Sequence, residues 1–309
     1  ERMLYKRQQE ILYLISQLNG IGKVKLQKLM FLANYKQDEV SYDFVPYKYG
    51  PYSFILQKDL DYLVSNNFLI FKHNKYRAIN PNYINITPKR RDILNSIISR
   101  YSMFSTKKLM QYVYREYPRF AIKSCKANSI LSAVEISEIK TQIPDTTNPS
   151  IFTIGYEGKS IDKYLSYLVF SGIKVLIDVR ANAISMKPEF SERNLGNFCN
   201  LMDIKYVHIP ELGISSKQRK EIKDKKILFQ DFRTNLTSNG SYYLNKIREL
   251  AITYKRIALP VLKLILKNAI GALLPKSFMI TYLKSINWWI YEEENTYSSK
   301  NLSQSFSKV

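Results

Sequence analysis

A short polar segment at residues 144–150 most constrains how this chain can fold. Its sequence, Pro-Asp-Thr-Thr-Asn-Pro-Ser, consists of turn and linker residues without apolar periodicity. Before the segment the apolar spacing is mostly helical, whereas after it strand and helix patterns alternate. Because 309 residues are long enough for two domains, we predict a mainly helical N-terminal domain and a C-terminal α/β domain joined by this linker.

The N-terminal half carries the element order of a winged helix. Helical apolar spacing covers about residues 11–18, 24–35 and 53–67, and a hairpin pattern follows over residues 68–79. Three helices followed by a two-stranded ribbon are typical of a winged helix-turn-helix. We therefore predict a winged-helix-like domain over residues 1–88 and a helical connector over residues 89–143.

In such a domain the third helix reads DNA and the ribbon, or wing, passes along phosphates. We accordingly predict nucleic-acid contacts from four basic residues: Lys58, Lys72, Lys75 and Arg77. Asp59 and Asp61 on the third helix weaken the case for DNA. The alternative is a winged helix used for protein contacts, since a fold alone does not establish DNA binding.

The net charge favours a polyanionic partner but does not locate it. The formal charge is +21, with an excess of 11 positive charges over residues 1–150 and of 10 over residues 151–309. The excess is therefore spread over the chain, with no detachable basic arm. A solvated lysine-rich surface remains the alternative to nucleic-acid contact.

Two local stretches of the N-terminal half carry a resemblance. Residues 25–32 (Lys-Leu-Gln-Lys-Leu-Met-Phe-Leu) and 42–52 (Tyr-Asp-Phe-Val-Pro-Tyr-Lys-Tyr-Gly-Pro-Tyr) resemble modules of bacterial antitoxin-like and phage-associated proteins. The resemblance keeps open a non-enzymatic regulator or an antitoxin-like binding protein.

The second half predicts a doubly wound, mostly parallel sheet over residues 151–291. Buried-strand patterns at residues 151–154, 175–179 and 205–208 are separated by helical patterns at about 161–170 and 191–202. In such sheets ligands bind beyond the carboxyl ends of the strands. The Ser-, Asn- and Lys-rich end, residues 292–309, is expected to be a disordered tail.

Polar residues gather where two of these strands end. Asp178 and Arg180 follow the second strand, and His208 and Glu211 follow the third, which brings all four to one edge of the predicted sheet. Arg180 can clamp a phosphate or carboxylate, and Asp178 can orient it or act as a base. Glu211 is a second acid/base candidate. The alternatives are a structural Asp178–Arg180 ion pair and a hydrogen-bonded core role for His208.

A glycine-containing loop follows the first strand of this half. Residues 155–160 read Gly-Tyr-Glu-Gly-Lys-Ser, with two residues between the glycines where a phosphate-binding P-loop needs four, so we reject a P-loop. The helix start that follows still exposes amides that can hold an anion. We predict ligand contacts from Gly155, Tyr156, Glu157 and Ser160.

Four motifs in this half carry a family resemblance. They lie at residues 153–160 (Thr-Ile-Gly-Tyr-Glu-Gly-Lys-Ser), 177–180 (Ile-Asp-Val-Arg), 188–190 (Pro-Glu-Phe) and 206–213 (Tyr-Val-His-Ile-Pro-Glu-Leu-Gly). Together they resemble the bacterial family known as domain of unknown function 488, over about residues 151–290. The resemblance implies a compact α/β domain of unassigned activity. Its recurring polar positions map onto Gly155, Asp178, Arg180, His208, Glu211 and Gly213.

The chain departs from that family at residues 260–279, which contain no acid, cysteine or histidine. The family has a Cys-x-Glu and a Cys-His-Arg motif here, a pattern that would supply a nucleophile. Back-translated with allowed codons and read two bases later, residues 260–276 yield Cys-Phe-Glu and Cys-His-Arg at the family's spacing. Our hypothesis is a compensated double frameshift over residues 260–279. If the sequence stands as written, we expect activity to be lost.

Composition excludes several other classes. Cys125 and Cys199 lie far apart and the only histidines are His73 and His208, so we predict no disulfide framework, no metal site and no cofactor. No apolar run approaches the roughly 20 residues that span a bilayer, so we expect a cytoplasmic protein without a membrane partner. We predict a nucleic-acid-directed protein whose α/β domain acts on a nucleotide or small phosphate-bearing ligand. A small-molecule hydrolase or transferase remains a further alternative, and whether the protein is an enzyme stays open.

Overall fold

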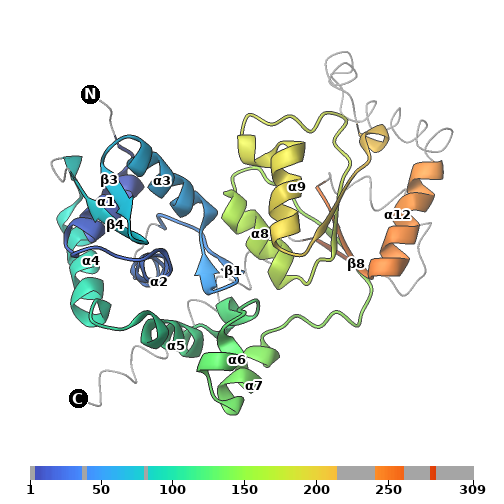
Figure 1. The fold of residues 1–309 in the computed structure, drawn as a ribbon. Coiled ribbons are helices and arrows are strands. Elements are labelled where there is room, and N and C mark those ends of the chain that lie inside the picture. Colours follow the sequence, from blue (N-terminus) through green and yellow to red (C-terminus); the bar gives the residue numbers. More distant parts are fainter. Residues whose placement is uncertain (1–3, 37–39, 80–82, 214–240, 261–278, 283–309) are drawn as a thin grey trace. The chain divides into compact units, whose positions relative to one another are not determined.

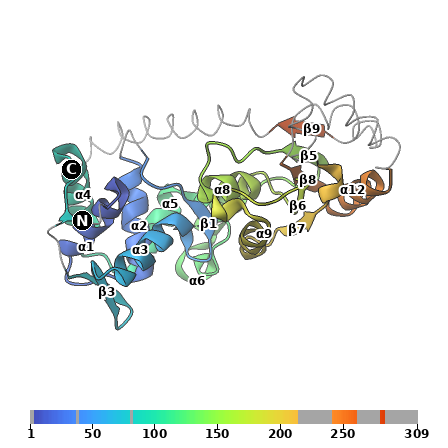
Figure 2. The ribbon, with the colours of Figure 1, turned by 90° about the horizontal axis from the view of Figure 1, so that it is seen from above.

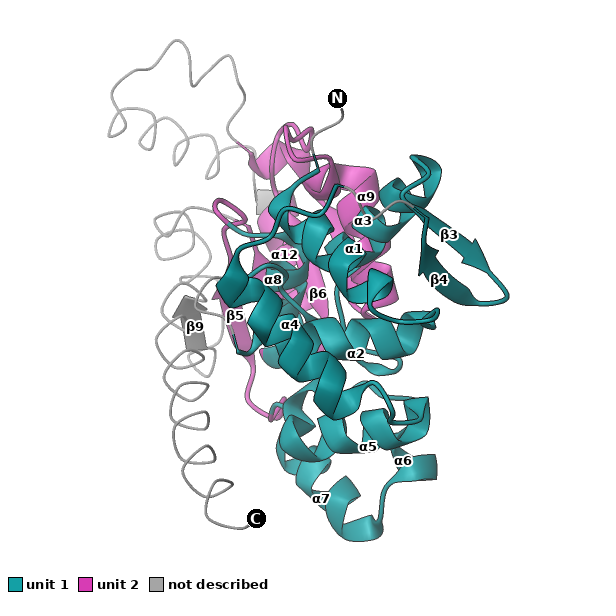
Figure 3. Ribbon diagram, turned by 90° about the vertical axis from the view of Figure 1, so that its left-hand side faces the viewer, with its two compact units in different colours: residues 1–144, 159–170 teal, residues 145–158, 171–309 magenta. Residues whose placement is uncertain are grey.

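The computed structural model describes residues 4–36, 40–79, 83–213 and 241–260, together with the backbone of residues 279–282. The chain divides into two compact units (Figure 3). The first comprises Glu1–Pro144 and Lys159–Phe170, and the second comprises Asp145–Gly158 and Ser171–Val309. The chain therefore passes from the first unit to the second, returns for one short segment, and leaves again.

The first unit begins with three helices and a small hairpin. The helices are α1 (Lys6–Ser16), α2 (Lys23–Asn34) and α3 (Phe54–Ser65). The Ser53 side chain caps α3 by accepting a hydrogen bond from the Leu56 amide at 3.1 Å. Between α2 and α3, strands β1 (Val45–Tyr47) and β2 (Gly50–Tyr52) pair antiparallel.

A second hairpin follows α3, as the hairpin pattern predicts. Strands β3 (Leu69–Lys72) and β4 (Lys75–Ala78) pair antiparallel, with Lys72 opposite Lys75. His73 and Asn74 form the turn with φ values of 50° and 57°, the left-handed geometry that a two-residue hairpin turn requires. Ile21, between α1 and α2, adds an isolated antiparallel bridge to Tyr76 of β4.

The remainder of the first unit is helical. It contains α4 (Pro88–Tyr101), α5 (Thr106–Glu116), the 3₁₀ turn η2 (Pro118–Ala121), α6 (Ala127–Ile130), α7 (Ala133–Thr141) and α8 (Ile161–Phe170). Side-chain caps begin α4, α5 and α7, at Thr87, Ser105 and Ser132. Phe31 of α2 lies at the centre of an aromatic cluster that includes Phe44 and Phe120. Phe120 also contacts Phe170 at the end of α8.

The second unit contains one parallel sheet, which confirms the predicted α/β class. Its strands are β5 (Ser150–Thr153), β6 (Val175–Asp178), β7 (Lys205–His208), β8 (Arg256–Leu259) and β9 (Met279–Tyr282). They lie in the order β7-β6-β8-β5-β9, and every pairing is parallel (Figure 2). The chain steps one way from β5 to β6 to β7 and then the other way to β8 and β9, as in a doubly wound sheet.

Two helices flank this sheet on opposite faces (Figures 1 and 2). Helix α12 (Ser241–Tyr254) packs Ile247 and Ala251 against Ile177 and Ile257 of the sheet. Helix α9 (Glu192–Leu201) lies on the other face. Its Gly196 lies against the Tyr206 ring, whereas the next residue of the strand, Val207, points to the α12 side. Short 3₁₀ turns, η3 (Pro188–Phe190) and η4 (Pro210–Leu212), follow β6 and β7.

Two sequence predictions fall outside the described residues: the disordered tail at residues 292–309, and nearly all of the frameshift segment at residues 260–279. Within the described residues, no helix has both the length and the apolar character needed to cross a membrane.

Candidate functional site

The end of β6 holds a tightly bonded carboxylate and guanidinium. Asp178 is fully buried, and its Oδ1 accepts from the Arg180 amide at 3.1 Å and from Arg180 Nε at 2.9 Å. Its Oδ2 accepts from Arg180 Nη2 at 2.6 Å. This two-point ion pair fixes the plane of the guanidinium. Asp178 and Arg180 therefore lie together, as predicted, and Asp178 holds the arginine side chain in one orientation.

Arg180 has further contacts on its other sides. Nη2 also donates to the Phe190 carbonyl at 2.8 Å, and the Tyr156 ring centroid lies 5.3 Å from Cζ. Nη1 is buried, yet it has no hydrogen-bond partner among the described residues. Burial opposes the charge of Arg180, but the hydrogen bond and charge of Asp178, helped by Tyr156, outweigh it and raise the arginine pKa. The group is therefore a permanent cation with one unused donor.

Tyr206 completes the cluster, although sequence reasoning did not single it out. Its hydroxyl donates to Asp178 Oδ2 at 2.7 Å. Burial, followed by this hydrogen bond, raises the pKa of Tyr206. The alternation of side chains along a strand could have identified Tyr206, because it lies two positions before His208 and so shares its face of the sheet.

His208 lies beside the pair and contacts it through the backbone. Its Nε2 is 2.8 Å from the Arg180 carbonyl, and because a carbonyl oxygen only accepts, Nε2 is the donor. Its Nδ1 is 3.2 Å from Glu192 Oε1 at the start of α9. The imidazole thus ties three segments together.

The predicted residues beyond β7 divide between two environments. Gly213 lies so close to the loop after β6 that an added Cβ would stand 2.1 Å from the Ala181 nitrogen, which excludes any side chain there. Glu211, in contrast, is exposed, and it interacts with Tyr243 of α12. Burial, then the charge and hydrogen bond of Glu211, raises the pKa of Tyr243.

The loop after β5 contributes an aromatic side chain to the site. Tyr156 stacks on Phe190 with ring centroids 4.9 Å apart and an interplanar angle of 22°. Glu157 is exposed. Nothing lies within 4 Å of a Cβ added at Gly155, so packing does not require a glycine at this position. Of the predicted ligand-binding residues in this loop, Tyr156 lies against Arg180.

Ser160, predicted with this loop, belongs to the first unit. Its hydroxyl donates to Asp43 Oδ2 at 2.7 Å and accepts from the Lys163 amide at 3.0 Å. The expected N-cap of α8 is present, and its hydroxyl is occupied by these contacts.

The described residues offer neither a reactive thiol nor a metal cluster at this edge. Burial, followed by the charge of Asp178, raises the pKa of the Cys199 thiol to about 12, which keeps it protonated. No group of three or more His, Cys, Asp or Glu side chains within the described ranges is arranged to hold a metal ion.

The predicted nucleic-acid contacts lie in the first unit, three of them on one hairpin. Lys72, Lys75 and Arg77 are exposed on β3 and β4, and within the described part of the chain none of them forms a salt bridge. Lys75 lies near Lys25 of α2, whose pKa is lowered first by burial and then by this like charge. Lys58 is exposed on α3. The hairpin is therefore an unneutralised basic surface.

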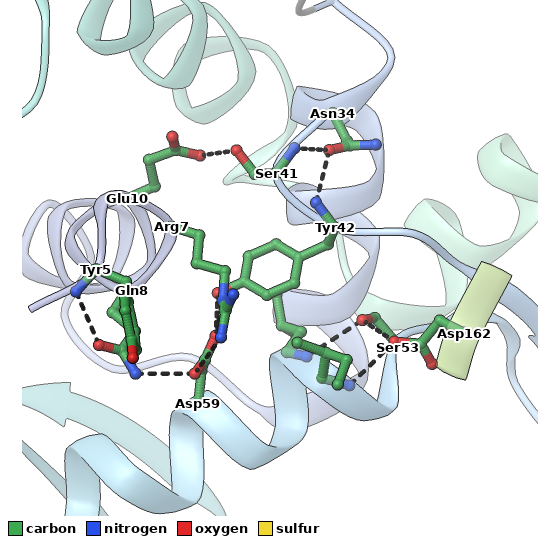
Figure 4. Close-up of polar contacts among 12 residues, drawn as sticks. Tyr5, Arg7, Gln8, Glu10, Asn34, Ser41, Tyr42, Ser53, Asp59 and Asp162 are labelled. Atoms are coloured by element: carbon green, nitrogen blue, oxygen red, sulfur yellow. Dashed lines mark hydrogen bonds and ion pairs between the residues drawn. The ribbon is translucent and has the colours of Figure 1, made fainter. Parts of the chain in front are cut away.

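The start and the middle of α3 are held by buried polar contacts (Figure 4). Asp162 of α8 accepts from Ser53 Oγ at 2.8 Å, from the Phe54 amide at 2.7 Å and from the Ile55 amide at 3.0 Å. Asp59 is buried and accepts from Arg7, Gln8 and Tyr42. Asp59 therefore does not lie on the outer face of α3, and its charge does not weaken the case for DNA binding there.

Comparison with known families bears on the second unit. Residues 160–261 match the model of the family described as Domain of unknown function DUF488, which supports the resemblance over that range. No curated protein matches the chain. The family match includes Asp178, Arg180, His208, Glu211 and Gly213, and it ends at the point where the frameshift hypothesis begins. The winged-helix resemblance lies outside the match and stays a prediction.

Proposed function

We propose that the first unit binds nucleic acid through the β3–β4 hairpin, as the wing of a winged-helix-like domain. The observation that carries this proposal is the concentration of Lys72, Lys75 and Arg77 on one hairpin without a neutralising acid among the described residues. Unpaired lysines and arginines gain binding energy from phosphates by releasing condensed counterions.

The order and pairing of the elements support this assignment. Helices α1, α2 and α3 precede the hairpin, and Ile21 adds a third short segment by pairing with Tyr76 of β4. The hairpin also lies near the start of α2, since Lys25 and Lys75 are close enough for their charges to interact. The basic surface thus extends from the hairpin to α2.

A salt-dependent binding measurement tests the proposal. Fluorescence anisotropy with a labelled DNA or RNA of about one to two helical turns should give a Kd that weakens steeply as salt rises. The triple variant Lys72→Glu/Lys75→Glu/Arg77→Glu should bind at least about tenfold more weakly, with a shallower salt dependence. The matched control, Lys107→Glu/Lys126→Glu/Lys140→Glu, reverses three exposed lysines on α5, just before α6 and on α7. Equal weakening by both triples would show that only net charge matters.

A second candidate function concerns the second unit. We also propose that it binds a small anionic, phosphate-bearing ligand at the carboxyl edge of the sheet, with Arg180 as the contacting residue. The buried, unpartnered Nη1 of Arg180 supports this proposal, because a buried donor without a partner is costly unless a ligand uses it. Asp178, which Tyr206 also contacts, then orients the arginine, and the Tyr156 ring lies beside its guanidinium.

Calorimetric titration with pyrophosphate and with nucleoside mono- and triphosphates tests this second candidate. Arg180→Lys keeps the charge but loses the two-point geometry, so affinity should fall by about tenfold or more. Arg193→Lys, the same change at an exposed arginine of α9, is the matched control and should bind normally. Separately, the nucleotide sequence over codons 255–285 tests the frameshift hypothesis. Codons that cannot yield Cys-Phe-Glu and Cys-His-Arg in the shifted frame would sink it.

A further inference from the structure

We infer that the first unit recognises the phosphate backbone of duplex DNA without reading its base sequence. This inference rests on the proposed nucleic-acid binding and specifies how it occurs. Two features of the first unit support it. Groups of α3 that could contact bases are engaged within the protein, and the hairpin offers positive charges.

The amino end of α3 is already occupied. In helix-turn-helix proteins the amino-terminal residues of the recognition helix contact base edges. Here the Phe54 and Ile55 amides both donate to the carboxylate of Asp162, which is fully buried (Figure 4). A second anion or base acceptor cannot take these amides unless Asp162 leaves.

The side chains of α3 that could read bases are also engaged. Gln57 is the residue type that pairs with adenine, but its Nε2 donates to Asp61 Oδ1 at 2.7 Å and to the Tyr76 hydroxyl at 3.3 Å, and its Oε1 is buried. Asn66 donates to the Tyr62 carbonyl at 2.8 Å. The exposed face of α3 carries one base and one acid, Lys58 and Asp61, which gives it no net attraction for DNA.

The hairpin, in contrast, offers charge without directional recognition. Lysine binds phosphate as a point charge, and contacts to phosphates position a protein on DNA without carrying sequence information. Lys72 and Lys75 face each other across the last pair of the hairpin, and Arg77 follows on β4 beside Gly20. These positions suit the repeating phosphates of a duplex, whatever bases it contains.

The test compares duplexes and variants in the full-length protein. A pool of random-sequence duplex DNA is bound, recovered and sequenced, and Kd is measured for three unrelated duplexes at one salt concentration. We expect no enriched motif, and Kd values within about threefold of one another, as for non-specific binding. Gln57→Ala should change Kd by less than about twofold, whereas the hairpin triple reversal should weaken binding at least about tenfold.

The outcomes separate this inference from the proposal beneath it. Enrichment of one sequence motif, or a tenfold loss with Gln57→Ala in a protein that unfolds at the wild-type temperature, would overturn sequence independence and leave nucleic-acid binding intact. Absence of salt-sensitive binding to any duplex would overturn both. A preference for single-stranded over duplex probes would overturn the choice of duplex DNA.

Discussion

Asp162 in the first unit and Asp178 in the second are both fully buried, yet they are satisfied in opposite ways. Asp162 accepts from two backbone amides and a serine hydroxyl, all of them uncharged. Asp178 accepts from an arginine and a tyrosine. The first carboxylate joins two helices, whereas the second holds a cation at the edge of a sheet.

Neutral and charged surroundings have opposite effects on the charge of a buried side chain. Burial raises the pKa of Asp162 to about 7, against the effect of its hydrogen bonds from Ile55, Phe54 and Ser53. Burial likewise lowers the pKa of Lys28, whose Nζ donates to the Pro51 carbonyl at 2.8 Å, to about 7. Arg180, which faces an opposite charge, has a raised pKa and stays charged. Buried charges that meet neutral groups are thus driven towards neutrality, and the paired one is not.

The largest expected effect comes from breaking the charged pair. Asp178→Ala leaves the Arg180 guanidinium largely buried without its counter-charge, and should lower the free energy of unfolding by about 3–5 kcal/mol. Urea unfolding, followed by circular dichroism, measures the loss. The double variant Asp178→Ala/Arg180→Met removes the stranded charge and should recover part of it. A double variant no more stable than the single one would contradict the role given to the pair.

A smaller effect is expected at the uncharged clamp. Asp162→Ala leaves the Phe54 and Ile55 amides without their acceptor, and should cost about 2–3 kcal/mol. Asp162→Asn keeps a side-chain acceptor and should cost less, as the same urea titration would reveal. If Ala and Asn variants lose equal stability, the amide contacts are not what the carboxylate contributes.

Lys28 should produce an effect that is the smallest over any single pH unit, seen as a pH dependence of stability. Between about pH 7 and 10 the unfolded chain keeps the lysine proton while the folded chain has released it, so stability rises with pH. Relative to Lys28→Met, the wild-type free energy of unfolding should rise by up to about 1.4 kcal/mol per pH unit over that window. Parallel stability curves for the two proteins would refute the lowered lysine pKa.

Local pattern was sufficient to predict much of this molecule. Apolar spacing located the helices, serine caps such as Ser105 marked a helix start, and alternating strands and helices predicted the parallel sheet. The rule that parallel strands end at one edge also brought Asp178 and His208 to the same place, where they face each other across β6 and β7.

What local pattern missed depends on contacts between distant segments. Asp162 reads as an ordinary acid in the first turn of a helix, and nothing nearby in sequence shows that it accepts from amides 107 and 108 positions away. The stacking of Tyr156 on Phe190 is equally non-local. Strands β1 and β2 are only three residues long, too short for an alternation to be recognised between prolines and a glycine.

The return of α8 to the first unit has a consequence for synthesis. A ribosome that has just finished the 144–150 linker has not yet made Lys159–Phe170, so the nascent first unit lacks the carboxylate that caps α3. Domains generally fold as units while the chain emerges, amino-terminal first. Here the first unit can reach its final structure only after β5 of the second unit has been translated. Synthesis of the second unit therefore begins before the first unit can finish folding.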